Sequence, residues 1–420
     1  MAILGQTFPY EFLSNAYRAG EALIIQRQII NDPVRTNLWQ PARTDARGVT
    51  VYDPVRASPG YTLYTSGDDN AARLMTMDGR IVHEWRRPFS TVWNDQAVVN
   101  SPQPDNLIYM DKARLLPNGD LLTIYISSAD TPWGYGIAKI DKDSNLIWSY
   151  LASAHHDFDF ASDNQIYVLT HAFNFEKPVQ APQLSIPYLE DFLVVLTPDG
   201  KEVKKISLTD AVLKSPYRPL FHILPFFSLS DPLHTNTVEY IDADKARNFP
   251  FGEEGDALVS FRNIALVAVV SVRTGEIRWA TRGRWVGQHD PSILPNGDIL
   301  LFDNLGGFRG NNSSQLTQFD PRTLTVTWSY SGDEDRPFYS QLRSSAERLA
   351  NGNTLINESD GGRLFEVTRS GDIVWEYMNP VRRGDNEELI AVVSSGQRIN
   401  PATFDPEFRK MLEQQEQASR

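Results

Sequence analysis

Hydrophobic and polar positions follow one repeating order along most of the chain. Each repeat begins with a polar residue and an apolar pair, followed by a turn of the Pro-Asn-Gly-Asp type. An alternating apolar run and a polar turn come next, and the repeat closes with an apolar strand that ends in Trp. The clearest copies are residues 113–150, 289–330 and 344–377, with Asn-Gly at 118–119, 296–297 and 351–352. Asn-Gly between two β-rich runs is a strong hairpin signal, because both residues tolerate positive φ. Each copy therefore predicts a small antiparallel sheet.

More divergent copies occupy residues 60–85, 155–208 and 234–279, which brings the number of units to six. The closing residues Trp279, Trp328 and Trp375 recur at about the 40 to 50 residues of one propeller blade. Units of about four strands, closed radially so that sheet edges are protected, are typical of a propeller. The pattern therefore predicts an all-β fold, a six-bladed β-propeller.

The units divide the chain into a propeller over 51–380, an N-terminal extension over 1–50 and a C-terminal extension over 381–420. Each extension is expected to hold a short helix that packs against the propeller or caps it. The first helix is predicted over residues 11–30 from apolar residues at helical spacing: Phe12, Ala16, Leu23 and Ile30. The second is predicted over 406–418, where Pro stands in the first turn.

Charge and composition exclude several classes of function. The chain has 40 basic and 53 acidic side chains, a net charge of -13 that has the wrong sign for a nucleic-acid binder. It has no Cys, which excludes disulfides, thiol catalysis and Cys-ligated metal. The start of the chain lacks the pattern of a signal peptide, and no apolar run is long enough to span a membrane.

Basic residues recur at the same end of neighbouring units. In an antiparallel hairpin, the residue numbers of each facing pair add up to the same sum. The position of the turn therefore predicts which residues face each other far from it. This arithmetic pairs His289 with Asn304, His156 with His171, and His234 with Arg262. The first strand of each blade lines the central channel of a propeller. We therefore expect His156, His171, His234, Arg262 and His289 at one mouth of the channel.

Imidazole and guanidinium groups around a channel predict an anion site, because each donates charge-assisted hydrogen bonds to sulfate or phosphate oxygens. A neutral His can also attack an electrophilic centre, with neighbouring cations stabilising the transition state. Strand alternation predicts that His155 faces away from His156. A transition-metal site remains an alternative because Asp157 and Asp290 adjoin histidines, although alternation turns each Asp away from its neighbour.

Four stretches resemble the bacterial arylsulfate sulfotransferases and the wider arylsulfotransferase-like propeller group. They are His155-His156-Asp157-Phe158, His234-Thr235-Asn236-Thr237, Ser260-Phe261-Arg262-Asn263, and Gln288-His289-Asp290 running into 294–304. The resemblance implies a six-bladed propeller that transfers a sulfuryl group from a phenolic sulfate ester to a phenol through a sulfated His, without a nucleotide donor. It also implies an extracytoplasmic, periplasmic location with a leader or anchor removed; a cytoplasmic location is the alternative.

The resemblance assigns a role to each candidate residue. It implies His289 as the nucleophile, with His156, His234 and Arg262 binding sulfate oxygens and handling the phenol proton. His171, Asn236 and Asn304 are expected to contact the substrate. No cofactor and no metal ion are expected; the partners are an aryl sulfate donor and a phenolic acceptor. With an ordinary imidazole pKa near 6.5, activity is expected to rise through mildly acid pH.

Two other functions remain open at this point. One is a propeller that binds anionic aromatic ligands or protein partners without catalysis. The other is a quinone-dependent dehydrogenase, which six units in place of eight disfavour. Loop aromatics that are candidates for stacking on a phenyl ring are Trp133, Tyr135, Phe173, Phe226 and Phe308.

Overall fold

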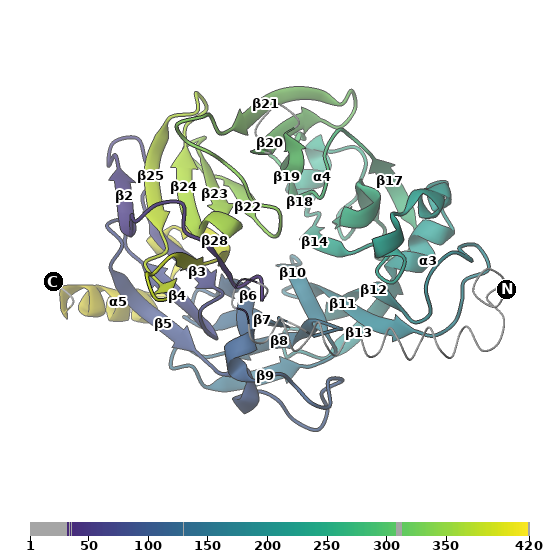
Figure 1. Ribbon diagram of the computed structural model, residues 1–420, viewed down its shortest axis with the longest axis horizontal. Coiled ribbons are helices and arrows are strands. Elements are labelled where there is room, and N and C mark those ends of the chain that lie inside the picture. Colours follow the sequence, from purple (N-terminus) through teal and green to yellow (C-terminus); the bar gives the residue numbers. More distant parts are fainter. Residues whose placement is uncertain (1–31, 33, 35, 129, 308–312, 419–420) are drawn as a thin grey trace.

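The repeated hairpins form six antiparallel sheets that stand in a ring (Figure 1). The structure is a computed structural model that describes residues 32, 34, 36–128, 130–307 and 313–418. The expected helix over 11–30 lies outside these residues. The six-bladed all-β propeller predicted from the repeats is confirmed, because each predicted unit supplies one sheet.

The sheets follow one another in chain order, and the first strand of a blade is the innermost. The first blade contains β28 (Val393–Ile399), β3 (Tyr61–Ser66), β4 (Ala71–Met75) and β5 (Ile81–Arg86). The second contains β6 (Ile108–Leu115), β7 (Leu121–Ser127), β8 (Gly134–Ile140) and β9 (Leu146–Tyr150). The third contains β10 (Ala154–Phe160), β11 (Ile166–Asn174), β12 (Tyr188–Leu196) and β13 (Glu202–Ser207).

The other three blades repeat this order. The fourth contains β14 (Thr235–Tyr240), β15 (Ala257–Phe261), β16 (Leu266–Val270) and β17 (Ile277–Thr281). The fifth contains β18 (His289–Ile293), β19 (Ile299–Gly307), β20 (Ser313–Asp320) and β21 (Thr325–Ser331). The sixth contains β22 (Ser345–Arg348), β23 (Thr354–Glu358), β24 (Arg363–Val367) and β25 (Ile373–Met378), with β2 (Gly48–Tyr52) at its outer edge. A small sheet combines β1 (Trp39–Pro41), β27 (Leu389–Ala391) and β26 (Arg382–Arg383).

The first blade is completed by a strand from the far end of the chain. β28 pairs antiparallel with β3, from Val393 opposite Ser66 to Ile399 opposite Tyr61. The sequence unit at 60–85 holds only three strands, so its sheet takes its innermost strand from beyond residue 380. β2, which begins at Gly48, before the predicted start of the propeller at residue 51, likewise pairs with β25. Sheet pairing therefore extends beyond both ends of the repeat region, because these pairs are not local in sequence.

The recurring Trp residues join neighbouring blades. The indole N–H of Trp85 donates to the Gly119 carbonyl at 3.0 Å, and that of Trp375 donates to the Met77 carbonyl at 2.8 Å. The indole N–H of Trp328 donates to the Arg369 carbonyl at 2.9 Å. Each bond runs from an outer strand to a turn of the next blade. A buried indole is stabilised by such an acceptor, so Trp joins the blades at these three interfaces; the indole N–H of Trp148 has no hydrogen-bond partner among the described residues.

Helices lie outside the ring of sheets. They are α3 (Leu208–Leu213), α4 (Ala243–Asn248) and α5 (Pro406–Ala418). The predicted helix at 406–418 is confirmed as α5, which packs Phe408 against Trp85 and His83 of the first blade (Figure 1). Within the described residues, no helix is both long and apolar enough to cross a bilayer.

Candidate active site

The ring of sheets brings the predicted basic residues to one end of the channel. His155 and His156 begin β10, His289 begins β18, and His234 directly precedes β14. Arg262 directly follows β15, whose end lies beside the start of β14; its N–H donates to the His234 carbonyl at 3.4 Å. The predicted pairing of His234 with Arg262 is thus confirmed.

A cavity of about 320 Å³ lies on the channel at this end. His156, Asn236 and His289 line it, together with the inner strands of the second and sixth blades. The His234 ring lies beside that of His156, with their centroids 5.0 Å apart. The inner strand of the first blade also lines the cavity through residues 394–397, so all six blades contribute to it, and neither His234 nor Arg262 is among the lining residues.

One ring nitrogen of His289 is held by two acceptors. Nδ1 lies 2.8 Å from the Asn304 amide oxygen and 2.9 Å from the Gly287 carbonyl. Two acceptors at one nitrogen require the proton on Nδ1, so the lone pair is on Nε2. The predicted strand pairing of His289 with Asn304 is wrong by two residues, because a bulge after His289 pairs it with Phe302. The two side chains still meet.

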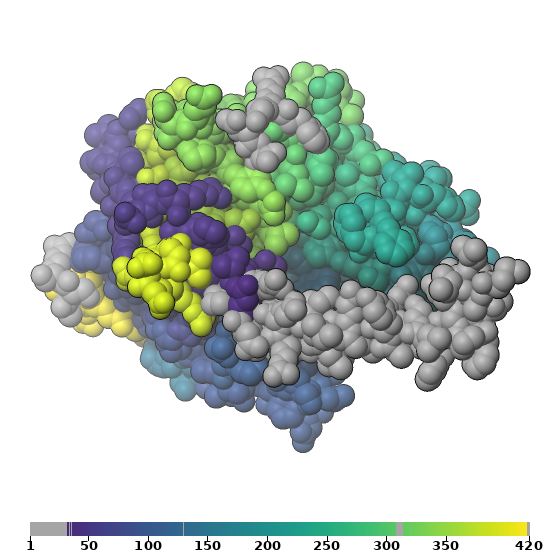
Figure 2. All heavy atoms as spheres, in the orientation of Figure 1, coloured from purple at the N-terminus to yellow at the C-terminus, as the bar shows by residue number. Residues whose placement is uncertain are grey.

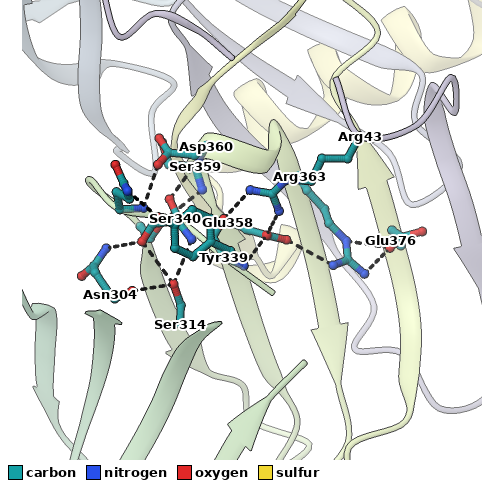
Figure 3. A network of polar contacts seen from close by, with 12 residues as sticks. Arg43, Asn304, Ser314, Tyr339, Ser340, Glu358, Ser359, Asp360, Arg363 and Glu376 are labelled. Carbon is teal, nitrogen blue, oxygen red and sulfur yellow. Dashed lines mark hydrogen bonds and ion pairs between the residues drawn. The ribbon is translucent and has the colours of Figure 1, made fainter. Parts of the chain in front are cut away.

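The orientation of Asn304 is fixed in turn by the loop that leads into the sixth blade (Figure 3). Its amide nitrogen donates to the carbonyls of Ser340 at 3.0 Å and Arg343 at 3.1 Å, which turns its oxygen toward His289. The Ser340 N–H donates to the Ser314 hydroxyl at 2.8 Å, and that hydroxyl donates to the Asn304 carbonyl at 2.9 Å. A buried polar network of this kind holds the His289 ring in one tautomer.

Carboxylates of the sixth blade hold the same loop. Asp360 accepts the Gln341 N–H at 2.7 Å, and Glu358 accepts the Tyr339 N–H at 2.8 Å (Figure 3). Glu358 is almost fully buried and forms an ion pair with Arg363 at 3.1 Å. The position of His289 therefore depends on ion pairs in the neighbouring blade.

His155 and His156 contact each other, contrary to the prediction from strand alternation. Their Nδ1 atoms are 2.7 Å apart. The ladder between β10 and β11 shifts register between Ala154 and Phe158, and His156 has a φ of 55°. A bulge with a left-handed residue redirects side chains, so alternation does not hold here. Because of the same bulge, His156 does not face His171 in the ladder between β10 and β11, so the predicted cross-strand pair of these two residues is wrong.

His171 lies behind the cavity and is not among its lining residues. Its ring stacks on that of His155 with centroids 4.3 Å apart, and its Nε2 accepts the Gly134 N–H at 3.2 Å. Trp133 covers the cluster, with its ring centroid 4.7 Å from that of His171 and 5.1 Å from that of His234. His171 therefore supports the shape of the site from a second layer.

His234 is paired with a carboxylate that the sequence reasoning missed. Its Nδ1 lies 2.5 Å from Asp231 Oδ2, which places the Nδ1 proton against the carboxylate and leaves Nε2 for proton transfer. The spacing Asp-x-x-His before a predicted strand was the only available signal, and such a spacing is common by chance. Asp231 belongs to the candidate site as a positioning residue.

Arg262 lies in the site without an ion pair among the described residues. Its Nε is buried with no hydrogen-bond partner in this part of the chain, and its Nη1 donates to Asn263 at 3.2 Å. Burial lowers the pKa of Arg262, whereas Asp231 opposes that shift. A buried cation with an unused donor is expected to bind an anion.

Burial keeps the imidazoles of His156 and His289 neutral. It lowers the pKa of His289 to about 3, and the positive charge of Arg262 adds to this effect. Burial, followed by the charges of His155 and His234, also holds the pKa of His156 well below 6.5. His289 is therefore a free base across mildly acid pH. The expected rise of activity near pH 6.5 does not come from this group.

Asn236 has a structural bond at one end and faces the cavity. Its amide nitrogen donates to the Gln288 carbonyl at 2.8 Å, next to His289. Gln288 is fully buried, and its amide donates to the Ser260 hydroxyl and the Phe261 carbonyl. These bonds tie the fourth blade to the fifth at the site.

Ligand atoms for a metal ion come together behind the cavity and not at the expected acidic residues. His155, His171 and Asp191 each offer one atom, and the three atoms lie within 4.8 Å of one another. Asp157 instead pairs with Lys112 at 2.5 Å, and Asp290 accepts the Ala346 N–H at 2.9 Å. The Gly134 N–H donates to Nε2 of His171, so the ring proton of His171 stands on Nδ1. This is the tautomer of an imidazole whose Nδ1 does not bind a metal ion.

Comparison with known proteins identifies the family. The chain matches the family model for arylsulfotransferase (ASST) over residues 112–380. No curated protein matches it significantly. Two solved structures that it resembles are a protein of unknown function from Bacteroides caccae and virginiamycin B lyase from Staphylococcus aureus. The first is 14% identical in sequence, and the match covers 81% of this chain and 98% of the other, with a TM-score of 0.48. The second is 12% identical, and the match covers 82% of this chain and 88% of the other, with a TM-score of 0.42.

The family match covers every predicted site residue and more than half of the chain. The chain therefore belongs to the arylsulfotransferase (ASST) family and is an enzyme of the aryl-sulfate sulfotransferase type.

Proposed function

We propose that this protein transfers a sulfuryl group from a phenolic sulfate ester to a phenolic hydroxyl through a covalent sulfo-His289, without a nucleotide donor. The observation that supports it most is the arrangement at His289. Its Nδ1 proton is bonded to Asn304, its pKa is near 3, and its Nε2 is free for attack. A neutral imidazole is the reactive form of a His nucleophile.

In the first half-reaction, the lone pair on Nε2 of His289 attacks the sulfur atom of the ester. The N–S bond forms as the bond between sulfur and the aryl oxygen breaks, and its electron pair leaves with the phenolate. Negative charge develops on the sulfuryl and aryl oxygens. Arg262 supplies a fixed positive charge and hydrogen-bond donors for these oxygens, which is the usual source of electrostatic stabilisation.

In the second half-reaction, the acceptor phenol must lose its proton as its oxygen attacks the sulfur. Nε2 of His234 takes that proton, and Asp231 stabilises the imidazolium through Nδ1. The S–N bond breaks, and its electron pair returns to Nε2 of His289. The proton on His234 then leaves to solvent, or to the departing phenolate in the next cycle.

Labelling of His289 tests the proposal directly. The protein is mixed with 4-nitrophenyl sulfate, nitrophenol release is followed, and quenched samples are mapped by peptide mass spectrometry. We expect a burst of nitrophenol equal to the enzyme concentration and one SO3 group on the peptide that carries His289. His289→Gln should abolish both signals. His83→Gln is the matched control, because His83 lies on the outer strand β5 and bonds to the Lys142 carbonyl.

The same experiment separates the proposal from its rivals. Absence of both nitrophenol and adduct over a panel of phenolic sulfates would contradict the proposal and favour a propeller that only binds anionic aromatics. Modification of His156 or His234 in place of His289 would assign the nucleophile to another residue.

A further inference from the structure

The loops around the mouth of the cavity expose an unusual amount of apolar surface. Each blade's first strand starts at this face, so the connections between blades and the loops after the second strands all lie on it. In the third to fifth blades these are residues 175–187, 208–234 and 282–288, together with the end of β19 at 305–307. Figure 2 shows the teal segment that includes residues 216–230 standing out on the face toward the viewer.

Large apolar side chains gather in these loops and in the strand end before them. The most exposed are Val179 (89%), Phe226 (84%), Phe227 (79%) and Phe175 (70%). The others are Phe173, Ile186, Ile223, Val286 and Leu305. We name these nine residues the mouth patch. Apolar clusters of this kind mark surfaces that bind a partner or a membrane.

Exposed apolar residues elsewhere are differently distributed. Ile81, Ile147, Val203 and Val326 are exposed one to a strand on β5, β9, β13 and β21, the outermost strands of four different blades. The others are Val34, Tyr52, Val55, Val98 and Leu324, of which Val55 is 91% exposed. Isolated exposed apolar residues of this kind are normal on a protein surface. The mouth patch is therefore a feature of one face and not of the surface in general.

The mouth patch stands on ordered backbone. The Ser185 N–H donates to the Leu229 carbonyl at 3.0 Å, and the Leu189 N–H donates to the Ser230 carbonyl at 2.8 Å. The Gln183 amide donates to the Phe221 carbonyl at 2.8 Å, and Phe221 is fully buried. Two loops from the third blade thus hold each other while their aromatic side chains point to solvent.

Positive charge accompanies the mouth patch in a chain of net charge -13. Lys177, Arg218, Arg282 and Arg284 are exposed in the same loops, and none forms an ion pair with a carboxylate of the described residues. Lys214 is paired with Asp210 at 2.7 Å. Apolar aromatic groups flanked by free cations complement an anionic bilayer, which attracts cations and takes up apolar side chains.

We propose that the mouth patch docks this protein on an anionic membrane surface, with Phe175, Phe226 and Phe227 inserted between the lipid headgroups. Docking brings the mouth of the cavity against the bilayer, where lipophilic phenols and their sulfate esters partition. The protein then takes such substrates from the interface. A second copy of the chain that docked through the same face would bring two sets of free cations against each other, so the charge at this face disfavours it.

Vesicle flotation tests the proposal on the full chain. We expect the protein to float with vesicles of phosphatidylcholine and phosphatidylglycerol, and to bind phosphatidylcholine alone at least roughly tenfold more weakly. The double variant Phe226→Ser/Phe227→Ser should lower the partition coefficient roughly 100-fold, since each buried Phe side chain is worth about one decade or more. Arg282→Gln/Arg284→Gln should remove most of the dependence on anionic lipid.

The matched control is Ile147→Ser/Val203→Ser, which removes exposed apolar side chains from two outer strands. It should float like the unmodified chain, and circular dichroism should show the same fold for all variants. Flotation that survives the Phe substitutions would overturn the assignment of this surface. Absence of flotation would overturn membrane docking, and a dimer that depends on Phe226 and Phe227 in light scattering would identify a second copy as the occupant.

Discussion

Replacement of Arg262 separates charge stabilisation from the intrinsic reactivity of His289. Arg262→Gln keeps a long polar side chain but removes the guanidinium whose charge, after burial, does most to lower the pKa of His289. In the present structure the Arg262 Nε has no partner, and Nη1 bonds only to the neighbouring Asn263. The variant therefore loses donors for the sulfuryl oxygens without breaking an ion pair of the fold.

The size of the effect follows from the role of a transition-state donor. One preorganised donor is worth on the order of 100- to 1,000-fold in kcat, or about 2.7 to 4 kcal/mol. We expect a loss of this size for Arg262→Gln with 4-nitrophenyl sulfate. Arg262→Lys keeps the charge but not the planar fork, so it should recover most of the loss and remain roughly tenfold below the unmodified chain.

The pH profile gives a second, independent readout. After burial, the charge of Arg262 is the largest cause that lowers the pKa of His289 to about 3. Activity needs the neutral imidazole, so kcat/KM falls as pH drops through that pKa. Removal of the positive charge should move this acid limb to higher pH. A loss smaller than about fivefold, together with an unmoved acid limb, would refute the assignment of Arg262 to the sulfuryl group.

Three further substitutions test the supports of the site. Asn304→Leu removes one acceptor of the nucleophile's Nδ1 proton, so the burst rate should fall roughly tenfold in stopped-flow traces while KM changes little. Asp231→Asn weakens His234 as a base, so turnover with phenols of high pKa should drop at least roughly 100-fold while the nitrophenol burst persists. An equal loss in the burst and in turnover would contradict the role of Asp231 in positioning this base. Glu358→Ala leaves Arg363 with one partner fewer in a buried network, and urea unfolding should show a loss of about 3 kcal/mol.

The sequence predicted the architecture well because the fold repeats itself. Trp85, Trp328 and Trp375 each bond to the next blade, so their recurrence reports a contact that is made at three of the interfaces between sheets. The strand β28 could not be found in this way. Its partner β3 lies more than 300 residues earlier, and no local pattern records such a pairing.

The candidate site was predicted in part. Counting across turns paired His234 with Arg262 correctly; for His289 the count was wrong by two residues because of a bulge, although its side chain still meets that of Asn304. It failed at His156, where the bulge in β10 changes both pairing and direction. The low pKa of His289 depends on burial by several blades together, and the dyad with Asp231 depends on a loop conformation. Neither property is contained in a local stretch of sequence.

The pairing of β28 with β3 sets the order in which a newly made chain can become active. A ribosome has already produced the strands that carry His156, His234 and His289 long before it reaches Ile399. Until that last strand is released and docks, the circle has a gap between the first and sixth blades. Closure of the ring therefore requires residues 393–399, and a nascent chain that stops short of residue 393 leaves its histidines on an unclosed arc.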